Sequence, residues 1–288
     1  MKTRTLTGIL VALVYASVLL LTIYVHKVFF DVFVLLLMPI AGLEVAKAIG
    51  NKFAKPIDIF IILTSIGGYL AFKLIDAYLF RSSGVTIYFG VWAVMLIACI
   101  VYCMISKNRT MANVTSTLFV LVYPVTILFY MLGLNYLPRE NFNVAALLLL
   151  VLVSSFTDTF AYFFGALIKG PKLCPSISPK KTVAGALGGI LGGIFGAGIA
   201  LLFSVYGFAK TPMLSSDGVI NILHYLLIGM IGSIFTQLGD IVASYVKRQC
   251  AVKDFGRTLP GHGGIMDRID GMILNTVFIY VYLTVLAI

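Results

Sequence analysis

The sequence has little charge for its length. Only 11% of its 288 residues are Asp, Glu, Lys or Arg, whereas 60% are hydrophobic and the mean hydropathy is +1.05. A soluble domain cannot hide so much apolar surface, because its own outer face has to be largely polar. The composition therefore excludes a soluble globular protein and predicts that lipid surrounds most of the chain.

Cysteines are few, and several familiar motifs are missing. Cys99 and Cys103 lie in one apolar run, where we expect them to pack, whereas Cys174 and Cys250 fall in predicted loops and are expected to be reduced. The sequence contains no Walker loop and no dinucleotide-binding glycine fingerprint, which excludes the familiar soluble nucleotide-binding folds. The first apolar run has no small-residue cleavage site, so we interpret it as a retained helix.

Long apolar runs make up most of the chain instead. A helix needs about 20 mostly apolar residues to cross a bilayer. By this rule we expect nine such segments, at residues 6–25, 28–47, 57–80, 86–106, 111–134, 143–167, 183–206, 219–246 and 270–288. The sequence thus predicts an all-α polytopic membrane protein with about nine transmembrane helices. We divide it into N-terminal helices, residues 1–140, and a C-terminal region, residues 141–288, with polar loops at 168–182 and 247–269.

The distribution of basic residues predicts the orientation. One side of the predicted topology, which includes the N-terminus and the two polar loops, carries 16 of the 21 Lys and Arg residues. The other side carries only Lys27, Lys73, Arg81, Arg139 and Lys210. Such an excess marks the cytoplasmic side. We therefore expect a cytoplasmic N-terminus, cytoplasmic polar loops and a C-terminus at the outer face, and the net charge of +10 needs no nucleic acid to explain it.

The first 140 residues contain nothing that resembles a site. Asp31, Glu44, Asp58 and Asp76 lie near predicted span ends. We interpret them as solvated or snorkelling carboxylates, because a charge at the centre of a span would be costly. Functional residues are therefore expected in the second half.

The second half begins with a carboxylate in an apolar run and a basic loop. The run SSFTDTFAYFFG, residues 154–165, places Asp158 in or near the inner end of a span. The loop KGPKLCPSISPKKT, residues 169–182, is rich in lysine, and its prolines exclude a helix. The next span repeats glycine every four residues, which predicts close backbone contact with a neighbouring helix.

The eighth predicted span ends in the polar sequence QLGDIVASYVKR, residues 237–248. At 3.6 residues per turn, Asp240, Ser244, Lys247 and Arg248 fall on one helical face. This face has two interpretations. It is either an ion pair that closes a helix end, joining Asp240 to Lys247 or Arg248, or a functional group of residues, since carboxylates within membrane spans are functional candidates.

The stretch KDFGRTLPGHGGIMDRIDG, residues 253–271, favours the functional interpretation. Glycines around His262 let the backbone bend and approach a ligand closely, and successive N–H groups in such a loop can bind an anion. Asp267 and Asp270 then open the last helix with carboxylates on one face. Together with Asp240 they can supply the oxygen ligands that Mg²⁺ takes alongside substrate phosphates. The residues alone thus predict a metal-dependent phosphoryl or nucleotidyl transfer site at the cytoplasmic membrane surface.

The same stretch carries a family resemblance. Residues from Ser244 to Asp270 resemble the signature of the phosphatidate cytidylyltransferases, also called CDP-diacylglycerol synthases. The matching positions are Ser244, Lys247, Arg248, Lys253, Asp254, Gly256, Pro260, His262, Gly263, Gly264, Asp267, Arg268 and Asp270. The runs Asp158 to Gly165 and Ser178 to Thr182 agree with two weaker family features, and the opening MKTRTLTGILVAL is similar to the start of bacterial members.

The resemblance implies an enzyme of phospholipid biosynthesis in the bacterial cytoplasmic membrane, with its active site facing the cytoplasm. It implies conversion of CTP and phosphatidate to CDP-diacylglycerol and pyrophosphate, with Mg²⁺ required. The implied catalytic residues are Asp240, Asp267, Lys247 and Arg248, and the implied metal ligands are Asp240, Asp267 and Asp270. The implied substrate-binding residues are Ser178, Lys180, Lys181, Ser244, Lys253, His262, Gly263, Gly264 and Arg268. The roles of Asp158 and Asp254 stay open, and a homodimer is compatible with the sequence.

Two other functions remain as alternatives. A CTP-dependent polyprenol or dolichol kinase would transfer the γ-phosphoryl group and release CDP instead of pyrophosphate. A membrane transporter would use Asp158 and Asp240 as ion sites, but it should show inverted repeats with broken helices in both halves. The polar features of this chain gather in one half, which disfavours a transporter.

Overall fold

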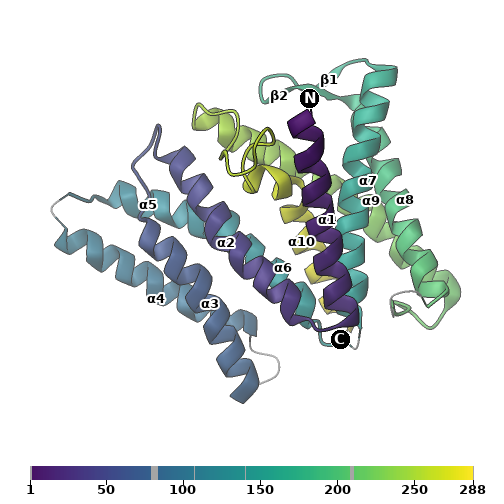
Figure 1. The fold of residues 1–288 in the computed structure, drawn as a ribbon, viewed down its shortest axis with the longest axis horizontal. Coiled ribbons are helices and arrows are strands. Elements are labelled where there is room, and N and C mark those ends of the chain that lie inside the picture. Colours follow the sequence, from purple (N-terminus) through teal and green to yellow (C-terminus); the bar gives the residue numbers. More distant parts are fainter. Residues whose placement is uncertain (1, 79–83, 107, 140, 208–210, 288) are drawn as a thin grey trace. The chain divides into compact units, whose positions relative to one another are not determined.

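The protein is helical over most of its length (Figure 1). The computed structural model describes residues 2–78, 84–106, 108–139, 141–207 and 211–287. The helices run in the order α1 (Lys2–Tyr24), α2 (Val28–Ile49), α3 (Asp58–Tyr78), α4 (Gly84–Ile105), α5 (Met111–Val120), η1 (Leu121–Thr126), α6 (Ile127–Gly133), η2 (Leu134–Tyr136), α7 (Phe142–Ile168), α8 (Val183–Val205), α9 (Gly218–Gln249) and α10 (Met266–Ala287). Two short strands, β1 (Lys172–Cys174) and β2 (Ser178–Thr182), lie between α7 and α8.

The prediction of an all-α polytopic membrane protein is confirmed. Within the described residues, seven helical segments are long and apolar enough to cross a membrane, and the part of α1 at Leu10–Tyr24 is apolar as well. The predicted span 57–80 forms the helix α3, Asp58–Tyr78. The helices make this an integral membrane protein.

The fifth predicted span, residues 111–134, is not one continuous α-helix. It consists of α5, the π-helical segment η1, α6 and the short 3-10 segment η2. The break lies at Tyr123, which has non-helical torsion angles of φ −124° and ψ 110° and precedes Pro124. A proline lacks a backbone N–H and pushes the preceding residue toward extended conformations, so the helical hydrogen bonds are interrupted here.

The chain forms two compact units, each assembled from separate stretches of sequence. The first unit comprises Met1–Leu13, Asp31–Phe129 and Lys247–Arg268. The second comprises Val14–Phe30, Tyr130–Val246 and Ile269–Ile288. The stretch 247–268, which carries most of the signature, therefore packs with helices of the N-terminal half.

Helices α3 and α4 lie side by side in the first unit (Figure 1). Asp31 on α2 is fully buried and forms an ion pair with Lys73 on α3, at 2.8 Å between Nζ and Oδ2. The interpretation of Asp31 as a solvated carboxylate is therefore wrong, because a basic partner from another helix allows it to be buried. Asp58 is exposed as expected, and the side chain of Asp76 lies outside the described residues.

The second unit is built on close contact between α7 and α8. A Cβ atom on Gly192 would lie 2.3 Å from the carbonyl oxygen of Phe156, and one on Gly196 would lie 2.5 Å from that of Leu152. Gly193 approaches α9 in the same way, with 2.5 Å to the carbonyl oxygen of Gly229. The glycine repeat thus serves close helix packing, as its spacing predicts.

A polar network joins three helices of the second unit. Ser154 on α7 contacts Thr236 on α9 at 3.2 Å between hydroxyl oxygens, and Asn275 on α10 donates to the Ser154 hydroxyl at 3.1 Å. All three side chains are buried. Hydrogen bonds of this kind help to hold membrane helices together, so they fix the three helices that carry acidic residues nearer their ends.

The basic loop 169–182 contains a small antiparallel hairpin that the sequence did not predict. Strands β1 and β2 pair with Lys172 opposite Thr182 and Cys174 opposite Ser178. Both strands are edge strands, where a proline such as Pro179 is tolerated because its missing N–H can face away from the partner. The prolines excluded a helix correctly, but their spacing does not distinguish an irregular loop from a hairpin.

Candidate functional site

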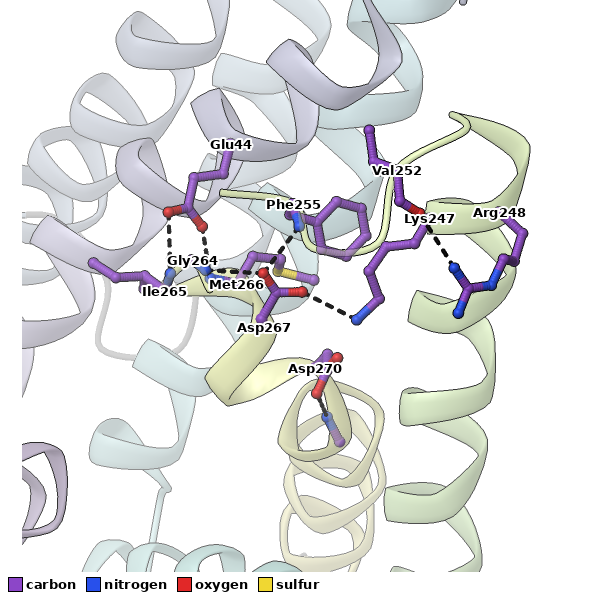
Figure 2. Close-up of polar contacts among 11 residues, drawn as sticks. Glu44, Lys247, Arg248, Val252, Phe255, Gly264, Ile265, Met266, Asp267 and Asp270 are labelled. Carbon is purple, nitrogen blue, oxygen red and sulfur yellow. Dashed lines mark hydrogen bonds and ion pairs between the residues drawn. The ribbon is translucent and has the colours of Figure 1, made fainter. Parts of the chain in front are cut away.

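A hydrogen-bonded carboxylate lies at the start of α10 in the first unit. Asp267 is only 7% exposed, and both of its oxygens accept hydrogen bonds. Oδ2 accepts from the backbone N–H groups of Phe255 and Gly264, each at 2.9 Å. Oδ1 pairs with the Nζ atom of Lys247 at 3.0 Å (Figure 2). Asp267 therefore ties together the end of α9, the loop after it and the first turn of α10.

Lys247 is held on two sides. Its side chain is 12% exposed, and its ammonium group lies 5.3 Å from the centre of the Phe255 ring as well as against Asp267. A lysine ammonium has three donors, and one of them is engaged by Asp267. The cation–π contact and the ion pair together restrict a side chain that would otherwise be mobile. Lys247 is thus a pre-oriented cation, and its carboxylate partner is Asp267.

A second carboxylate reaches the same loop from α2. Glu44 is 8% exposed and accepts hydrogen bonds from the backbone N–H groups of Ile265 at 3.0 Å and Met266 at 2.8 Å (Figure 2). The Thr258 hydroxyl also donates to it. The interpretation of Glu44 as a solvated span-end carboxylate is wrong, because donors from a loop more than 200 residues later allow its burial.

Several glycines of the signature are required by these carboxylates. A Cβ atom on Gly256 or on Gly264 would lie 2.3 Å from an oxygen of Glu44. Gly263 has a φ of +82°, and a Cβ there would lie 2.9 Å from Oδ2 of Asp267. No other residue type fits these positions without displacing a carboxylate. These glycines therefore allow the loop backbone to lie directly against the carboxylates of Glu44 and Asp267.

The other signature residues of the first unit are more open. Lys253 and Arg268 are exposed, and Arg248 donates to the carbonyl oxygen of Val252 at 3.5 Å. The buried Nδ1 atom of His262 has no hydrogen-bond partner among the described residues. The opposite ring nitrogen lies 3.4 Å from where a Cβ on Gly8 of α1 would be. His262 therefore packs against α1, while Lys253 and Arg268 are exposed at the surface of the unit.

The second unit contains a separate lysine–aspartate pair. Asp240 on α9 and Lys181 on β2 are 2.7 Å apart between Oδ2 and Nζ, and their side chains are 37% and 23% exposed. Lys181 also donates to the carbonyl oxygen of Gln237 at 3.4 Å. The partner of Asp240 is thus a residue of the hairpin rather than a neighbour on its own helix. The hairpin brings a cation to the carboxylate, which sequence spacing could not indicate.

Asp158 on α7 belongs to the same region of the second unit. It interacts electrostatically with both Asp240 and Lys181, and its side chain is exposed. One of its oxygens lies 3.8 Å from where a Cβ on Gly271 of α10 would be. Asp158 had no assigned role from the sequence, and the fold places it near Asp240.

Asp270 on α10 reaches this region through its backbone. A Cβ atom on Gly239, next to Asp240, would lie 2.6 Å from the carbonyl oxygen of Asp270. One carboxylate oxygen of Asp270 accepts from the N–H of Gly271 at 3.0 Å. Glycine at 239 therefore allows α9 and α10 to approach closely beside the acidic residues.

The donor chemistry of the second unit fits a hard divalent cation. Asp158, Asp240 and Asp270 offer carboxylate oxygens, and Asp240 and Asp158 are accessible. Within the described residues, no three Asp, Glu, His or Cys side chains gather closely enough to hold a metal by themselves. Mg²⁺ is usually bound by one or two carboxylates with water and substrate phosphates completing the shell. The arrangement therefore suits a cation that arrives with a phosphate ligand.

Three residues that contact Asp267, Lys247 or the loop before α10 were not predicted from the sequence. They are Glu44, Thr258 and Phe255. Thr258 and Phe255 lie inside the signature but carry no charge that draws attention. Glu44 had one usable signal, since a carboxylate within an apolar span is by default a functional candidate. Its partners lie too far along the sequence for any spacing rule to identify them.

Comparison with known proteins identifies the family. The sequence matches the cytidylyltransferase family over residues 2–286. It is 30% identical over 289 residues to a phosphatidate cytidylyltransferase of Bacillus subtilis, a match that covers 97% of this chain and 96% of the relative.

Other relatives match over shorter stretches. A phosphatidate cytidylyltransferase of Brucella abortus is 36% identical over 144 residues, 50% of this chain and 48% of the relative. One of Staphylococcus haemolyticus is 45% identical over 122 residues, 42% of each chain. The match thus spans about half the length of the Brucella relatives. The chain belongs to the cytidylyltransferase family.

Proposed function

We propose that this protein is a phosphatidate cytidylyltransferase. In the proposed reaction, a phosphate oxygen of phosphatidate attacks the α-phosphorus of CTP. The bond from that phosphorus to the oxygen bridging to the β-phosphate breaks, and pyrophosphate leaves. The products are CDP-diacylglycerol and pyrophosphate. The observation that carries the proposal is the signature stretch 244–270, in which buried carboxylates hold Lys247 and the loop glycines in a fixed arrangement.

Lysines and arginines would hold the phosphates in this reaction. Lys247 and Lys181 are each oriented by an aspartate, through pairs of 3.0 Å and 2.7 Å. Lys253, Arg268 and Lys180 are exposed and able to meet an incoming polyphosphate. Such groups stabilise the charge that develops at the reacting phosphate, provided that they are already oriented before the reaction. A phosphate monoester is itself a nucleophile, so no protein base is needed.

Mg²⁺ is the proposed cofactor, and it would neutralise charge on the triphosphate when bound. Asp240 and Asp270 are proposed to supply oxygen ligands, and Asp158 offers another carboxylate near Asp240. Asp267 is also proposed as a ligand from the signature, and a cation bound there would share its oxygens with Lys247 and two backbone N–H groups.

The test is a product analysis with purified protein. Incubation with CTP labelled at the α-phosphate, phosphatidate and Mg²⁺ should give labelled CDP-diacylglycerol and an equal amount of pyrophosphate. Omission of phosphatidate should abolish both products. Release of labelled CDP together with a phosphorylated polyprenol acceptor would identify a CTP-dependent lipid kinase instead. Retention of all label in CTP under every condition would contradict the proposal.

The proposed location is the bacterial cytoplasmic membrane, with the polar loops facing the cytoplasm. Cys174 on β1 tests this orientation, because it is partly exposed and free. We expect a membrane-impermeant thiol reagent to leave Cys174 unlabelled in intact cells and to label it after permeabilisation. Cys250 is not a suitable probe, since it is only 1% exposed.

A matched positive control exists on the opposite side. Ser216, an exposed residue before α9, is predicted to face outward. Ser216→Cys should therefore be labelled in intact cells. Labelling of Cys174 from outside the intact cell would reverse the orientation.

A further inference from the structure

Glu44, in the N-terminal half of the chain, contacts the loop that precedes α10 through three hydrogen bonds. Its carboxylate accepts from the N–H groups of Ile265 and Met266 at 3.0 and 2.8 Å and from the Thr258 hydroxyl. Its sequence neighbours Leu43 and Val45 are apolar, and Glu44 itself is 8% exposed. A carboxylate buried in this way is costly unless its donors stay in place. The burial of Glu44 and the closed position of the loop therefore depend on each other.

The loop is shaped around this carboxylate. Gly256 and Gly264 each approach Glu44 so closely that a Cβ atom would lie 2.3 Å from one of its oxygens. Thr258, between them in sequence, donates to the same carboxylate. The loop therefore contacts the Glu44 carboxylate at Gly256, Thr258 and Gly264, and the two glycines leave room for its oxygens.

The contact points lie directly before the proposed functional residues. Met266 is the first residue of α10, and Asp267 follows it. The first N–H groups of a helix lack partners within the helix and favour a negative charge, so Glu44 satisfies two donors at this end. Asp267 in turn binds Gly264, Phe255 and Lys247. Glu44 and Asp267 therefore hold consecutive residues of the chain, Glu44 at Ile265 and Met266 and Asp267 at Gly264, and Asp267 also holds Lys247 (Figure 2).

We propose that Glu44 is a positioning residue, which fixes Asp267 and Lys247 for the reaction by anchoring the signature loop to α2. This inference rests on the proposed cytidylyltransferase function. In this role Glu44 differs from an ordinary packing residue, because it determines how the Asp267 carboxylate and the Lys247 ammonium are oriented. Small displacements of oriented groups lower the rate more than they lower substrate binding.

Cys250 provides a readout of loop anchoring that does not depend on activity. It follows α9, is 1% exposed and begins the loop that Glu44 holds. Burial raises the pKa of the Cys250 thiol, while the charge of Lys52 partly lowers it. Modification of this thiol therefore requires the loop to open. Peptide mass spectrometry distinguishes Cys250 from the other three free cysteines.

The experiment compares Glu44→Gln with the wild type and with Asp58→Asn as a matched control. Asp58 is an exposed carboxylate of the same unit, at the start of α3. Glu44→Gln places an amide N–H₂ group against a backbone N–H, so at least one hydrogen bond is lost. We expect kcat to fall about 10- to 100-fold, as is typical when a supporting residue of a site is lost, with KM values near those of the wild type. Cys250 should be modified about tenfold faster, because local opening becomes easier.

Thr258→Val is the milder variant, and it carries the test if Glu44→Gln does not fold. It removes one donor to Glu44 and should change kcat and Cys250 modification in the same direction by smaller factors. The proposal that Glu44 anchors the loop would be overturned if Cys250 were modified at an unchanged rate in the folded Glu44→Gln protein. If Glu44→Gln fails to fold, the same result in Thr258→Val would overturn it. So would a loss of activity that appears only in KM. If the wild type is inactive but Cys250 is modified faster in Glu44→Gln, the proposed function is refuted. The anchoring of the loop by Glu44 is then still supported.

Discussion

Asp240→Asn is expected to lose turnover by a factor on the order of 10² to 10³ or more while the protein stays folded and membrane-inserted. The substitution preserves side-chain size but removes the charge that a hard cation requires and that orients Lys181 at 2.7 Å. Because Asp240 is 37% exposed, the variant leaves no deeply buried charge without a partner, so its thermal stability should change little. Turnover across a Mg²⁺ series and the thermal midpoint in detergent measure the two effects on one preparation.

Asp217→Asn is the matched control for this prediction. Asp217 precedes the same helix, where its Oδ1 accepts from the N–H of Ile220 at 2.9 Å, and asparagine caps a helix about as well. Both turnover and stability should therefore match the wild type. Near wild-type turnover of Asp240→Asn at saturating Mg²⁺ would show that Asp240 serves only as the ion-pair partner of Lys181.

Asp267→Asn should lower both the thermal stability and the turnover. Asparagine can still accept from the N–H groups of Phe255 and Gly264, but its amide N–H₂ group would face the ammonium of Lys247. Removing one partner of a buried ion pair costs about 3–5 kcal/mol. For a chain of this size, such a loss lowers the thermal midpoint on the order of 10 °C. Turnover should fall as well, because Lys247 loses the group that orients it.

Lys247→Met distinguishes the ion pair from a metal role. If Asp267 acts through Lys247, the double variant Asp267→Asn/Lys247→Met should be no less stable than Asp267→Asn alone, because the two residues share one interaction. A capping role predicts that Asp267→Asn keeps both stability and rate. A stable but inactive Asp267→Asn protein, partly rescued by high Mg²⁺, would assign Asp267 to a metal. Asp58→Asn, which changes an exposed carboxylate of the same unit, again serves as the control.

The transmembrane architecture could be predicted because it depends on composition within short windows. About 20 apolar residues in succession require lipid, whatever surrounds them. The predicted segments accordingly appear as helices, with boundaries within a few residues for α2, α4, α8 and α9. The segment 111–134 differs because Pro124 interrupts the helical hydrogen bonds locally. A hydropathy average does not detect such a break.

The candidate site was predictable only as far as neighbouring residues define it. The signature concentrates charge and glycine between two apolar spans, and this contrast identified Lys247, Asp267 and the loop glycines. The close packing of α8 was also predictable, since glycines at helical spacing allow neighbouring helices to approach closely. The partners of these residues were not predictable. Lys181 comes to Asp240 from a hairpin, and Glu44 comes to the loop from α2.

The sequence by itself determined that this is a polytopic helical membrane protein with charged residues gathered at the end of one span and the start of another. These properties follow from the local transfer free energy of side chains and from the period of a helix. Only the tertiary structure decided which charges meet. It buried Asp31 against Lys73, placed Asp158 near Asp240, and enclosed Glu44 between Gly256 and Gly264. The physical reason is that a buried charge is stable only beside its donors, and folding can bring those donors from any distance along the chain.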